Sequence, residues 1–330
     1  MPSLVKGDNF ELLFSRVVSH IRYSPQYITS PRGSLCYENT VATLHLTNPR
    51  ARLLANPARK ADYGFGVGEF FWYWQGKRDL ETMLYYNKRM ANFSDDATTL
   101  KSAYGYILRP PPWKIFDGAT NPYPYYLTQW ESCTRELLKD RDSRRAVMMI
   151  QDRQNVCDLA FKDTKDFPCT LNLQFFIRED KLHLHVNMRS NDAFWGLTYD
   201  LFSFTLFQEM MMLELREAGY DSLQLGEYTH CAGSLHIYEK HFKDADAVVK
   251  AYLNTEFEAA APMEPLSLGE LASLAEQEEL LRTGKVAEIG ETQFSGGTRW
   301  MAQRLNEHRR KRDGERRGSL GPGDSDGAKV

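Results

Sequence analysis

The sequence predicts a protein built from both helices and β-strands, and three patterns support this class. In residues 171–177 every second side chain is apolar, and residues 182–188 repeat the same period of two after a short polar turn, which predicts a β-hairpin. Residues 8–22 carry apolar side chains at helical spacing behind Asp8 as N-cap, which predicts an amphipathic helix. Residues 201–215 are apolar nearly all round, which predicts a buried central helix.

Composition bounds the cellular setting and the partners. The chain has 330 residues, 42% of them hydrophobic, which is enough for a full core, and its net charge of −3 shows no bias toward nucleic acid or a membrane surface. No apolar run approaches the roughly 18 residues that span a bilayer, and the first residues lack a signal core. The five cysteines form no CxxC pair, so no metal site is expected. These features indicate a cytoplasmic, reduced protein.

Further elements follow from the same periodicities. The patterns predict strands at 40–46, 146–150 and within 223–238, and helices at 66–92, 128–139, 267–284 and 300–312. Residues 93–126 are rich in proline and aromatic residues, which suits either a pocket for a flat ring or ordinary packing. Three regions are expected: a catalytic domain at 1–255, a helical extension at 256–305, and a basic, disordered tail at 306–330.

The predicted hairpin brings one cysteine close to one arginine. It returns the chain beside its start, so Arg189 is expected near Cys169 although 20 positions separate them (189 − 169). A fixed cation beside a thiol favours the thiolate and makes a nucleophile. The alternative, an inert buried cysteine, is the commoner fate of this residue type.

The hairpin also carries the first of five motifs. Pro168-Cys169, about twenty residues, Arg-Ser-x-Asp at 189–192, a Gly-Leu-x-aromatic step at 196–199 and a polar residue at 200 resemble the core of the thymidylate synthases and the related pyrimidine nucleotide hydroxymethylases. Four more segments resemble family motifs in the family's order, namely Gly68–Gly76, Ala103–Gly105, Asp142–Arg145 and Gly233–Tyr238. One such motif is weak, whereas five in order over roughly residues 30–242 are specific.

The resemblance implies an α+β fold of the thymidylate synthase type. In that fold a large mixed β-sheet is flanked by helices, and two copies form a homodimer through the sheet face. Neighbouring arginines on an extended segment point to opposite sides. This agrees with the family arrangement, in which Arg144 and Arg145 reach the partner's phosphate site. A solvated pair at a strand edge is the alternative.

Most of the nucleotide site also follows from the resemblance. It implies that Cys169 adds to C6 of a pyrimidine 5′-nucleotide. The phosphate would be held by Arg189, Ser190 and Arg32 of the same subunit, as guanidinium groups suit phosphate oxygens. Arg32 could equally be a surface turn residue. His236 and Tyr238 share a strand face, a spacing that presents two hydrogen-bonding groups to the sugar.

Two further groups are implied, one for proton transfer and one for the one-carbon donor. Glu69 and Tyr104 match the family's catalytic glutamate and active-site tyrosine. Glu69 could instead be a dipole partner at a helix N-terminus, but apolar surroundings would raise its pKa and suit it to moving protons. The residues implied to face 5,10-methylenetetrahydrofolate are Asp192, Trp195, Gly196 and Tyr199.

Asp200 is the departure that bears on the substrate. Thymidylate synthases carry asparagine there, whose donor and acceptor match O4 and N3–H of uracil. A carboxylate offers only acceptors, so it suits the 4-amino group of cytosine. The proton that N3 needs can sit on the base or on Asp200. A buried polar mismatch gives discrimination on the order of 10⁴-fold. As an alternative, Asp200 could simply cap the following helix.

These features predict a cytidylate 5-hydroxymethyltransferase. Within the family the chain most resembles the CMP 5-hydroxymethylases of nucleoside-antibiotic biosynthesis of the mildiomycin type, with CMP favoured over dCMP. Two alternatives remain, a thymidylate synthase acting on dUMP and a non-catalytic, RNA-associated protein that uses the basic run 308–317. Most such runs are solvated, so no nucleic-acid partner is expected.

Overall fold

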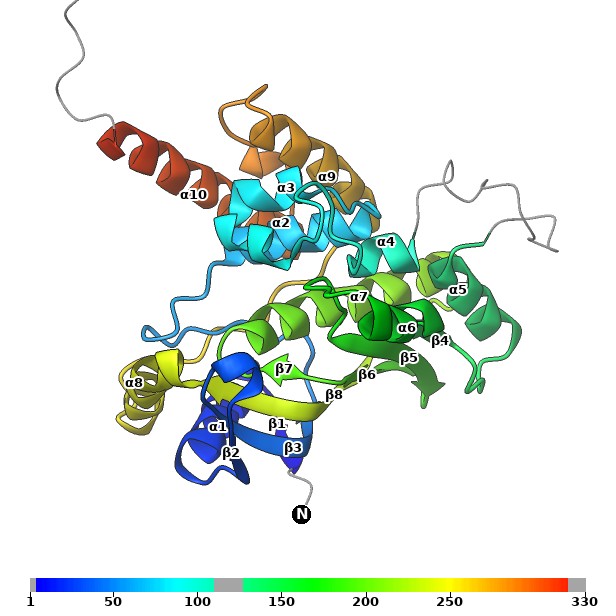
Figure 1. Cartoon of the computed structure of the whole chain (residues 1–330). Coiled ribbons are helices and arrows are strands. Elements are labelled where there is room, and N and C mark those ends of the chain that lie inside the picture. The colour runs from blue at the N-terminus through cyan, green and yellow to red at the C-terminus, as the bar shows by residue number, and fades with distance from the viewer. Residues whose placement is uncertain (1–3, 110–126, 320–330) are drawn as a thin grey trace, which may run out of the picture.

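The structure is a computed structural model that describes residues 4–109 and 127–319 (Figure 1). Residues 110–126, part of the proline- and aromatic-rich loop, lie outside the described residues. Both interpretations of this loop, a pocket for a flat ring or ordinary packing, fall on these residues. The predicted class is confirmed: a mixed β-sheet is flanked by helices.

One eight-stranded sheet forms the centre of the fold. Its main path runs in the order β1-β3-β8-β6-β5-β4, with β2 paired to β3 and β7 paired to β8. The sheet is mixed, because β6 pairs with β8 in parallel whereas β5 pairs with β6 and β3 with β8 antiparallel. The strands are β1 Leu4–Gly7, β2 Tyr27–Thr29, β3 Cys36–Leu46, β4 Val147–Met149, β5 Thr170–Arg178, β6 Lys181–Met188, β7 Asn191–Asp192 and β8 Gln224–Tyr238.

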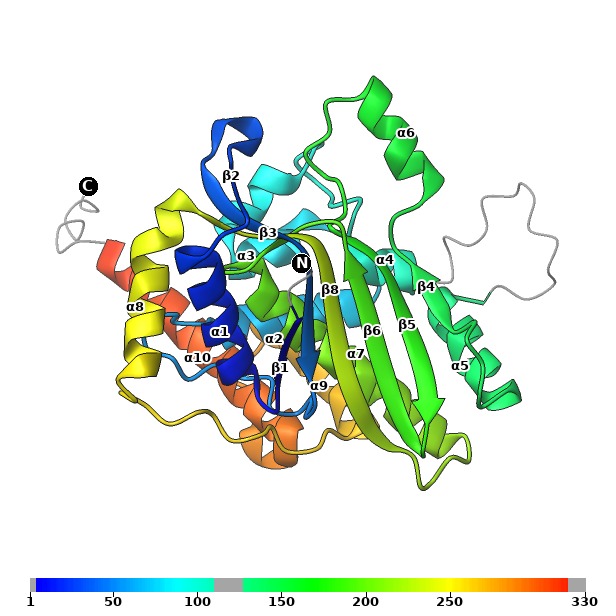
Figure 2. The same cartoon turned by 90° about the horizontal axis from the view of Figure 1, so that it is seen from below.

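Helices cover the two faces of the sheet unequally. α7 crosses the inner face, and α2, α3, α9 and α10 lie beyond it (Figure 1). From below, the opposite face of β5, β6 and β8 carries no helix, while α1 and α8 lie to one side (Figure 2). The helices are α1 Phe10–Tyr23, α2 Tyr63–Trp74, α3 Leu80–Tyr86, α4 Tyr104–Leu108, α5 Gln129–Lys139, α6 Arg153–Phe161, α7 Gly196–Glu217, α8 Phe242–Leu253, α9 Leu268–Arg282 and α10 Gly296–Ser319.

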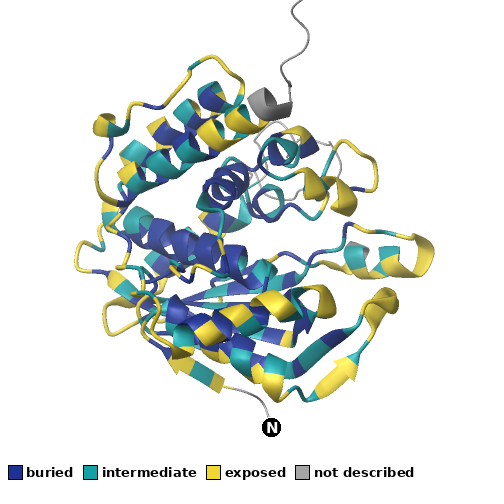
Figure 3. Ribbon diagram, turned by 90° about the vertical axis from the view of Figure 1, so that its left-hand side faces the viewer, coloured by how far each residue is buried: buried dark blue, intermediate teal, exposed yellow. Residues whose placement is uncertain are grey.

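The core lies between α7 and the inner face of the sheet, where the ribbon is mostly buried (Figure 3). The prediction that residues 201–215 form a buried central helix is confirmed in kind, since Leu201, Phe202 and Leu206 have no exposed surface. The helix starts five residues earlier than expected, at Gly196. A local turn precedes the helix: the side chain of Asp192 accepts hydrogen bonds from the backbone N–H groups of Phe194 and Trp195 and turns the chain just before α7.

The helix expected at 66–92 is divided into α2, α3 and a short 3-10 helix, Lys88–Phe93. Gly76 adopts a positive φ of 62°, which ends α2, and Asp79 caps α3 by accepting from the N–H of Thr82. Glu69 therefore lies in the middle of α2, among its buried residues, and not at a helix N-terminus. This excludes the dipole-partner interpretation of Glu69.

The expected disordered tail is wrong for residues 306–319, which belong to α10. The basic run is held by ion pairs that sequence alone did not reveal: Arg309 pairs with Asp313 at 2.9 Å, and Arg310 pairs with Glu288 at 2.8 Å. Arg312 donates to the backbone carbonyl of Tyr85. Residues 320–330 lie outside the described part of the chain.

Ser267 and Glu270 have the sequence spacing of a capping box, but the box does not form. Ser267 occupies the N-cap position of α9, but its side chain makes no capping hydrogen bond. Glu270 instead accepts from the N–H and hydroxyl of Ser295, at 2.9 and 2.8 Å. This carboxylate therefore fastens the start of α10 to α9 and not to its own helix.

Asp62 joins the end of the chain to the start of α2. Its carboxylate accepts from the N–H of Phe65 at 3.1 Å and so caps α2. The same carboxylate lies 3.3 Å from Nδ1 of His308 on α10, and its backbone N–H donates to the hydroxyl of Tyr199 on α7. Three helices thus meet at one residue.

Candidate active site

The β5–β6 hairpin places Cys169 and Arg189 together, as the sequence predicts. A tight turn with positive φ at Glu179 and Asp180 pairs Arg178 with Lys181. At the open end, the N–H of Arg189 donates to the carbonyl of Cys169 at 2.9 Å, and its Nη2 lies 3.6 Å from Sγ.

Two backbone contacts fix the Arg189 guanidinium. It donates to the carbonyls of Pro168 and Phe167 at 2.9 and 3.2 Å, and it lies over the Phe167 ring. On the other side, a Cβ at Gly233 would lie 2.9 Å from the Arg189 carbonyl, so only glycine lets β8 approach this closely. Nη1 makes no hydrogen bond to any residue in 4–109 or 127–319, which leaves it available to an anion.

The thiol of Cys169 differs from expectation in one respect. Burial raises its pKa, Arg189 and Arg32 lower it, and the nearby Asp200 carboxylate raises it, with a net increase. In the nucleotide-free chain the thiol therefore stays protonated, because burial and the negative carboxylate outweigh the two cations.

Asp200 lies inside the first turns of α7, so the structure excludes its interpretation as a helix N-cap. Its Oδ2 accepts a hydrogen bond of 2.6 Å from Nδ2 of Asn191 on β7. Burial raises the pKa of Asp200 to about 7, the hydrogen bond from Asn191 lowers it, and the charge of Asp192 raises it. The carboxyl is therefore close to half-protonated at neutral pH.

Glu69 is a second carboxyl of raised pKa, and it is buried. It is 8% exposed, and its Oε1 accepts a hydrogen bond of 3.4 Å from the Tyr73 hydroxyl, one turn further along α2. Burial raises its pKa to about 8, the Asp200 charge adds to the rise, and the Tyr73 hydrogen bond lowers it. The expected raised pKa of Glu69 is confirmed. Two carboxyls that titrate near neutral pH beside one another can pass a proton between them.

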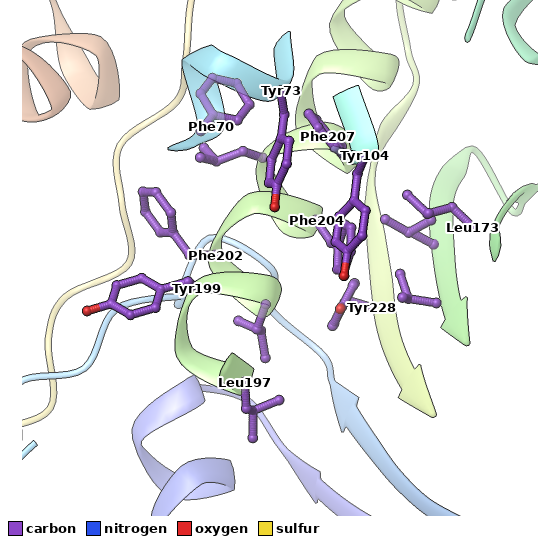
Figure 4. Close-up of a cluster of buried hydrophobic side chains, with 14 of the residues drawn as sticks. Phe70, Tyr73, Tyr104, Leu173, Leu197, Tyr199, Phe202, Phe204, Phe207 and Tyr228 are labelled. Atoms are coloured by element: carbon purple, nitrogen blue, oxygen red, sulfur yellow. The ribbon is translucent and has the colours of Figure 1, made fainter. Parts of the chain in front are cut away.

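Tyr104 stacks on Tyr73, with ring centroids 5.3 Å apart, and both hydroxyls point the same way (Figure 4). The following residue must be glycine, because a Cβ at Gly105 would overlap the backbone of Tyr73. Burial raises the pKa of Tyr104, and the charges of Asp200 and Cys169 raise it further. Tyr104 therefore presents a protonated hydroxyl toward the same centre as Cys169 and Asp200.

The strand pair expected to contact a sugar is formed. His236 and Tyr238 lie on one face of β8, with ring centroids 4.9 Å apart. Nδ1 of His236 lies 3.3 Å from the Ser234 hydroxyl, which donates to Glu38 on β3. Burial lowers the pKa of His236, although Asp192 and Glu38 raise it. A neutral imidazole of this kind can both donate and accept hydrogen bonds.

The remaining arginines are exposed. Arg32 sits in a short 3-10 turn, Pro31–Gly33, with a positive φ of 53°, and its charge reaches Cys169. Arg145 forms an ion pair of 2.8 Å with Glu136 of its own chain, while the Arg144 side chain is exposed. Ser190 is half-buried directly after Arg189.

The residues expected to face the folate lie between Arg189 and Asp200 in the sequence, and two of them are aromatic. Arg59 is 5% exposed and lies over the rings of Trp195 and Tyr199, both at 5.5 Å. Its Nε is buried without a partner in the described part of the chain. Asp192 uses only Oδ1 for its turn, and a Cβ at Gly196 would lie 3.4 Å from Oδ2 of Asp200.

These residues fit a flat, acidic heterocycle such as a folate. A buried, unpartnered guanidinium nitrogen among aromatic rings suits a planar ring system and its carboxylates, and the second oxygen of Asp192 suits a ring N–H. Within residues 4–109 and 127–319, no three His, Cys, Asp or Glu side chains are arranged to hold a metal ion.

Sequence reasoning missed three residues of the site. Asn191 lies inside the recognised Arg-Ser-x-Asp motif, at a position without an assigned role. Tyr73 lies one helical turn from Glu69, a spacing that could have identified it. Arg59 has no local signal, because its contacts with Trp195 and Tyr199 come from chain segments more than 130 positions away.

The fold and the site together define an α+β protein with a half-buried thiol beside a fixed guanidinium and two carboxyls of raised pKa, one buried and one half-buried. The thymidylate synthase family model matches residues 33–263, so the chain belongs to the thymidylate synthase family. Among the described helices none has the length and apolarity to cross a membrane.

Individual relatives are consistent with that assignment. The chain is 33% identical over 241 residues to deoxyuridylate hydroxymethyltransferase of Bacillus phage SP01, which is 72% of this chain and 60% of the relative. It is 30% identical over 236 residues to deoxyuridylate hydroxymethyltransferase of Delftia phage PhiW-14, which is 69% of this chain and 59% of the relative. The chain therefore spans about three fifths of the length of these relatives.

A solved structure shares the fold. Thermostable thymidylate synthase A from Bacillus subtilis matches with a TM-score of 0.58 and 19% identity, covering 78% of this chain and 87% of that one. The α+β, thymidylate synthase-like prediction for the fold is thereby confirmed.

Proposed function

We propose that this protein transfers a one-carbon unit from 5,10-methylenetetrahydrofolate to C5 of a cytidine 5′-monophosphate and adds water, giving the 5-hydroxymethyl nucleotide. CMP is favoured over dCMP. The observation that carries the base assignment is Asp200, a half-buried carboxyl of raised pKa at the position where thymidylate synthases have asparagine. It lies close enough to Cys169 for its charge to raise the pKa of that thiol.

The first step is assigned to the sulfur. Sγ of Cys169 forms a bond to C6 of the ring as its S–H bond breaks, and the electron pair of the C5–C6 double bond moves toward C5 and the N3 edge. N3 takes up a proton from Asp200, and the thiol's proton replaces it on the carboxyl. Arg189 has two roles in this step. Its guanidinium stabilises the thiolate, and its free Nη1 holds the phosphate of the bound nucleotide. Arg32 and Ser190 are assigned to the phosphate as well.

The proton at the N3 edge is assigned to Asp200. As charge moves onto the ring, the carboxyl keeps a proton between itself and N3, and it accepts a hydrogen bond from the 4-amino group. When bound, methylenetetrahydrofolate supplies the one-carbon unit at the oxidation level of formaldehyde. Glu69, with Tyr73 and Tyr104 beside it, is assigned to hold and move protons of water at this centre.

The sugar and the cofactor are assigned to the remaining side chains. His236 and Tyr238 would contact the sugar hydroxyl, a role that their shared strand face supports. Asp192, Trp195, Gly196 and Tyr199 would contact the folate, with Arg59 added from the structure.

A homodimer through the uncovered sheet face is part of the proposal. The face of β5, β6 and β8 that lacks helices is available to a second copy (Figure 2). In such a dimer Arg144 and Arg145 would reach the partner's phosphate site. Arg145 would first have to leave Glu136, with which it is paired in the single chain.

A second candidate is hydroxymethylation of dUMP. It is favoured by two relatives, both named deoxyuridylate hydroxymethyltransferase. A protonated Asp200 would donate to O4 of uracil, so this candidate requires Asp200 to be neutral. A third, methylation of dUMP as in a thymidylate synthase, would also release dihydrofolate.

One experiment separates these candidates. The purified protein is incubated with methylenetetrahydrofolate and with CMP, dCMP, UMP or dUMP in turn, and the products are identified by mass spectrometry. We expect 5-hydroxymethyl-CMP as the main product and no increase in the absorbance of dihydrofolate. Conversion of uracil nucleotides alone would overturn the proposal, and a methylated product with dihydrofolate would establish the third candidate.

A further inference from the structure

Asn191 is a buried amide beside the base-reading carboxyl that neither the family motif nor the proposed chemistry uses. It is 3% exposed and lies in β7, which is anchored by pairing with Leu235 of β8. Its Nδ2 donates to Oδ2 of Asp200 at 2.6 Å and to Sδ of Met188 at 3.2 Å. Both amide hydrogens therefore have acceptors, which fixes the orientation of the amide.

This orientation determines where a proton can sit on Asp200. The amide NH₂ is only a donor, so the oxygen that faces it, Oδ2, must be an acceptor. A proton on Asp200 is consequently placed on Oδ1. The carboxyl then offers one fixed acceptor and one fixed donor, where an isolated carboxyl would offer two interchangeable oxygens.

The order of donor and acceptor is what distinguishes the two pyrimidines. Cytosine needs an acceptor opposite its 4-amino group and a donor opposite N3, whereas uracil needs a donor opposite O4 and an acceptor opposite N3–H. A neutral carboxyl whose proton moves freely between its oxygens can match either base. A neutral carboxyl whose proton is fixed can match only one.

We propose that Asn191 is a specificity-determining residue, which selects the pyrimidine base by fixing the proton of Asp200 on Oδ1. The inference rests on the proposed pyrimidine nucleotide chemistry. A neutral Asp200 then presents one fixed order of donor and acceptor to the base. It can therefore select one base, although two relatives are named for uracil nucleotides.

The buried carbonyl of Asn191 supports this role. Oδ1 of Asn191 has no hydrogen-bond partner in the part of the chain that the structure describes. An unpaired buried acceptor costs free energy unless another molecule satisfies it. It lies on the same side chain that contacts Asp200, so a hydrogen of a bound base or an ordered water is the partner expected there.

Other charged and titratable groups also face Asp200, and they set its pKa together with Asn191. From α2 these are Glu69 and Tyr73, and from β7 it is Asp192. The remaining groups are Tyr104, Cys169 and Tyr228. In the described structure none of these groups donates a hydrogen bond to the Asp200 carboxylate, whereas Asn191 does. Replacing Asn191 therefore removes the fixed donor and leaves the charges in place.

The first test uses the wild-type protein and measures binding without folate. The Kd values of CMP and UMP are measured by calorimetry at about pH 6, where most Asp200 is protonated, and at about pH 8. A fixed proton predicts a preference of about 10-fold or more for one base at about pH 6, the amount that one hydrogen bond to a charged or buried group supplies. Equal affinities at about pH 6, with both nucleotides binding, would overturn the inference.

The second test replaces the amide. Asn191→Leu removes the donor at similar volume, and Asn191→Asp replaces it with a group that cannot donate when ionised. We expect both variants to bring the CMP:UMP ratio of kcat/KM toward 1 by about 10-fold or more, with the KM for methylenetetrahydrofolate unchanged. The pH at which CMP binding declines should move upward, because the Asn191 hydrogen bond lowers the pKa of Asp200.

The two levels of the argument fail in different ways. If the wild-type protein binds and converts no pyrimidine nucleotide, the proposed function fails. If it converts one, and folded variants keep both the base ratio and the pH profile of the wild type, the inference about Asn191 fails alone. Circular dichroism and thermal unfolding establish which variants are folded, and the wild-type binding test decides the question if neither is.

Discussion

The two ends of the proposed nucleotide site differ in how completely a single chain builds them. At the base end, Glu69 and Asn191 are 8% and 3% exposed, and hydrogen bonds to Tyr73 and Asp200 fix their positions. At the phosphate end, Arg32, Arg144 and Arg145 are exposed. The base end is therefore preorganised by packing. Most of the phosphate end is completed only by the charge of the substrate or of a partner subunit.

Arg189 is the exception at the phosphate end and shows why the two ends differ. It is held by carbonyls of its own hairpin, so its guanidinium is placed before any anion arrives. Changes at the base end should consequently alter chemistry and selectivity. Changes at the exposed arginines should alter nucleotide affinity by smaller amounts.

The largest effect is expected at the thiol that lies between the two ends. Cys169→Ala removes the nucleophile and should abolish product formation, a loss on the order of 10⁴-fold or more. Cys231→Ala is the matched control, because Cys231 is also half-buried but contacts His185 and Thr43 instead of Arg189. Product is measured by mass spectrometry. Activity retained in Cys169→Ala would contradict the assigned step.

The next effect tests the base end directly. Asp200→Asn restores the amide of thymidylate synthases and should turn preference from cytosine toward uracil, with a change in the CMP:UMP ratio of kcat/KM of roughly 10²- to 10⁴-fold. Competition between the two nucleotides in one reaction measures this ratio. A variant that loses activity equally on both bases would show that Asp200 does not read the base.

Glu69 allows the burial of the base end to be measured through pH. Its pKa is about 8 in the folded protein and about 4.5 when exposed, so the folded state binds more protons between these values. The free energy of unfolding should fall as pH rises from about 4.5 to about 8. Glu69→Gln removes this dependence. At about pH 8 we expect the free energy of unfolding of the variant to exceed that of the wild type by on the order of 2–4 kcal/mol.

Urea unfolding at a series of pH values checks this expectation. The same variant should lower kcat by roughly 10²- to 10⁴-fold, because an amide cannot carry the proton. Glu279→Gln is a suitable control, since that glutamate is exposed and paired with Lys77 on the surface. A variant with the wild-type pH dependence would show that Glu69 is not the buried titrating group.

The smallest effects should come from the exposed arginines. Arg144→Ala and Arg145→Ala are each expected to raise the nucleotide KM by about 10-fold, the scale of one charge-assisted hydrogen bond. Mixing Arg144→Ala protein with an excess of Cys169→Ala protein should bring the nucleotide KM back to the wild-type value, because each mixed dimer contains one complete site. The control mixture, Arg32→Ala with Cys169→Ala, should not be restored, since both residues are assigned to the same subunit. Restoration in both mixtures, or in neither, would contradict the shared site.

The same contrast explains what the sequence could predict. The hairpin and its Cys169–Arg189 contact followed from a strict period of two and a polar turn, which are local signals. The raised pKa of Glu69 followed from its apolar neighbours. The direction of the Cys169 pKa shift was misjudged, because burial of the thiol and the charge of Asp200 raise this pKa only in the folded chain.

Other errors came from interactions between distant segments. Arg309 and Arg310 looked like a solvated run, yet Asp313 and Glu288 pair with them and α10 continues to Ser319. The start of α7 was placed too late because the turn that Asp192 forms with Phe194 and Trp195 lies outside the apolar pattern. Periodicity shows where a helix is buried, but caps and ion pairs decide where it begins and ends.

Asp62 has a practical consequence for anyone who edits the C-terminus. Its carboxylate holds the first turn of the helix that carries Glu69, and the same group is held in turn by His308, 246 positions later (308 − 62). Trimming the chain before that histidine, or fusing a bulky tag onto α10, is therefore expected to loosen the first turn of the helix that carries Glu69. A shortened version that loses turnover would be explained by a displaced Glu69, the residue proposed to move protons.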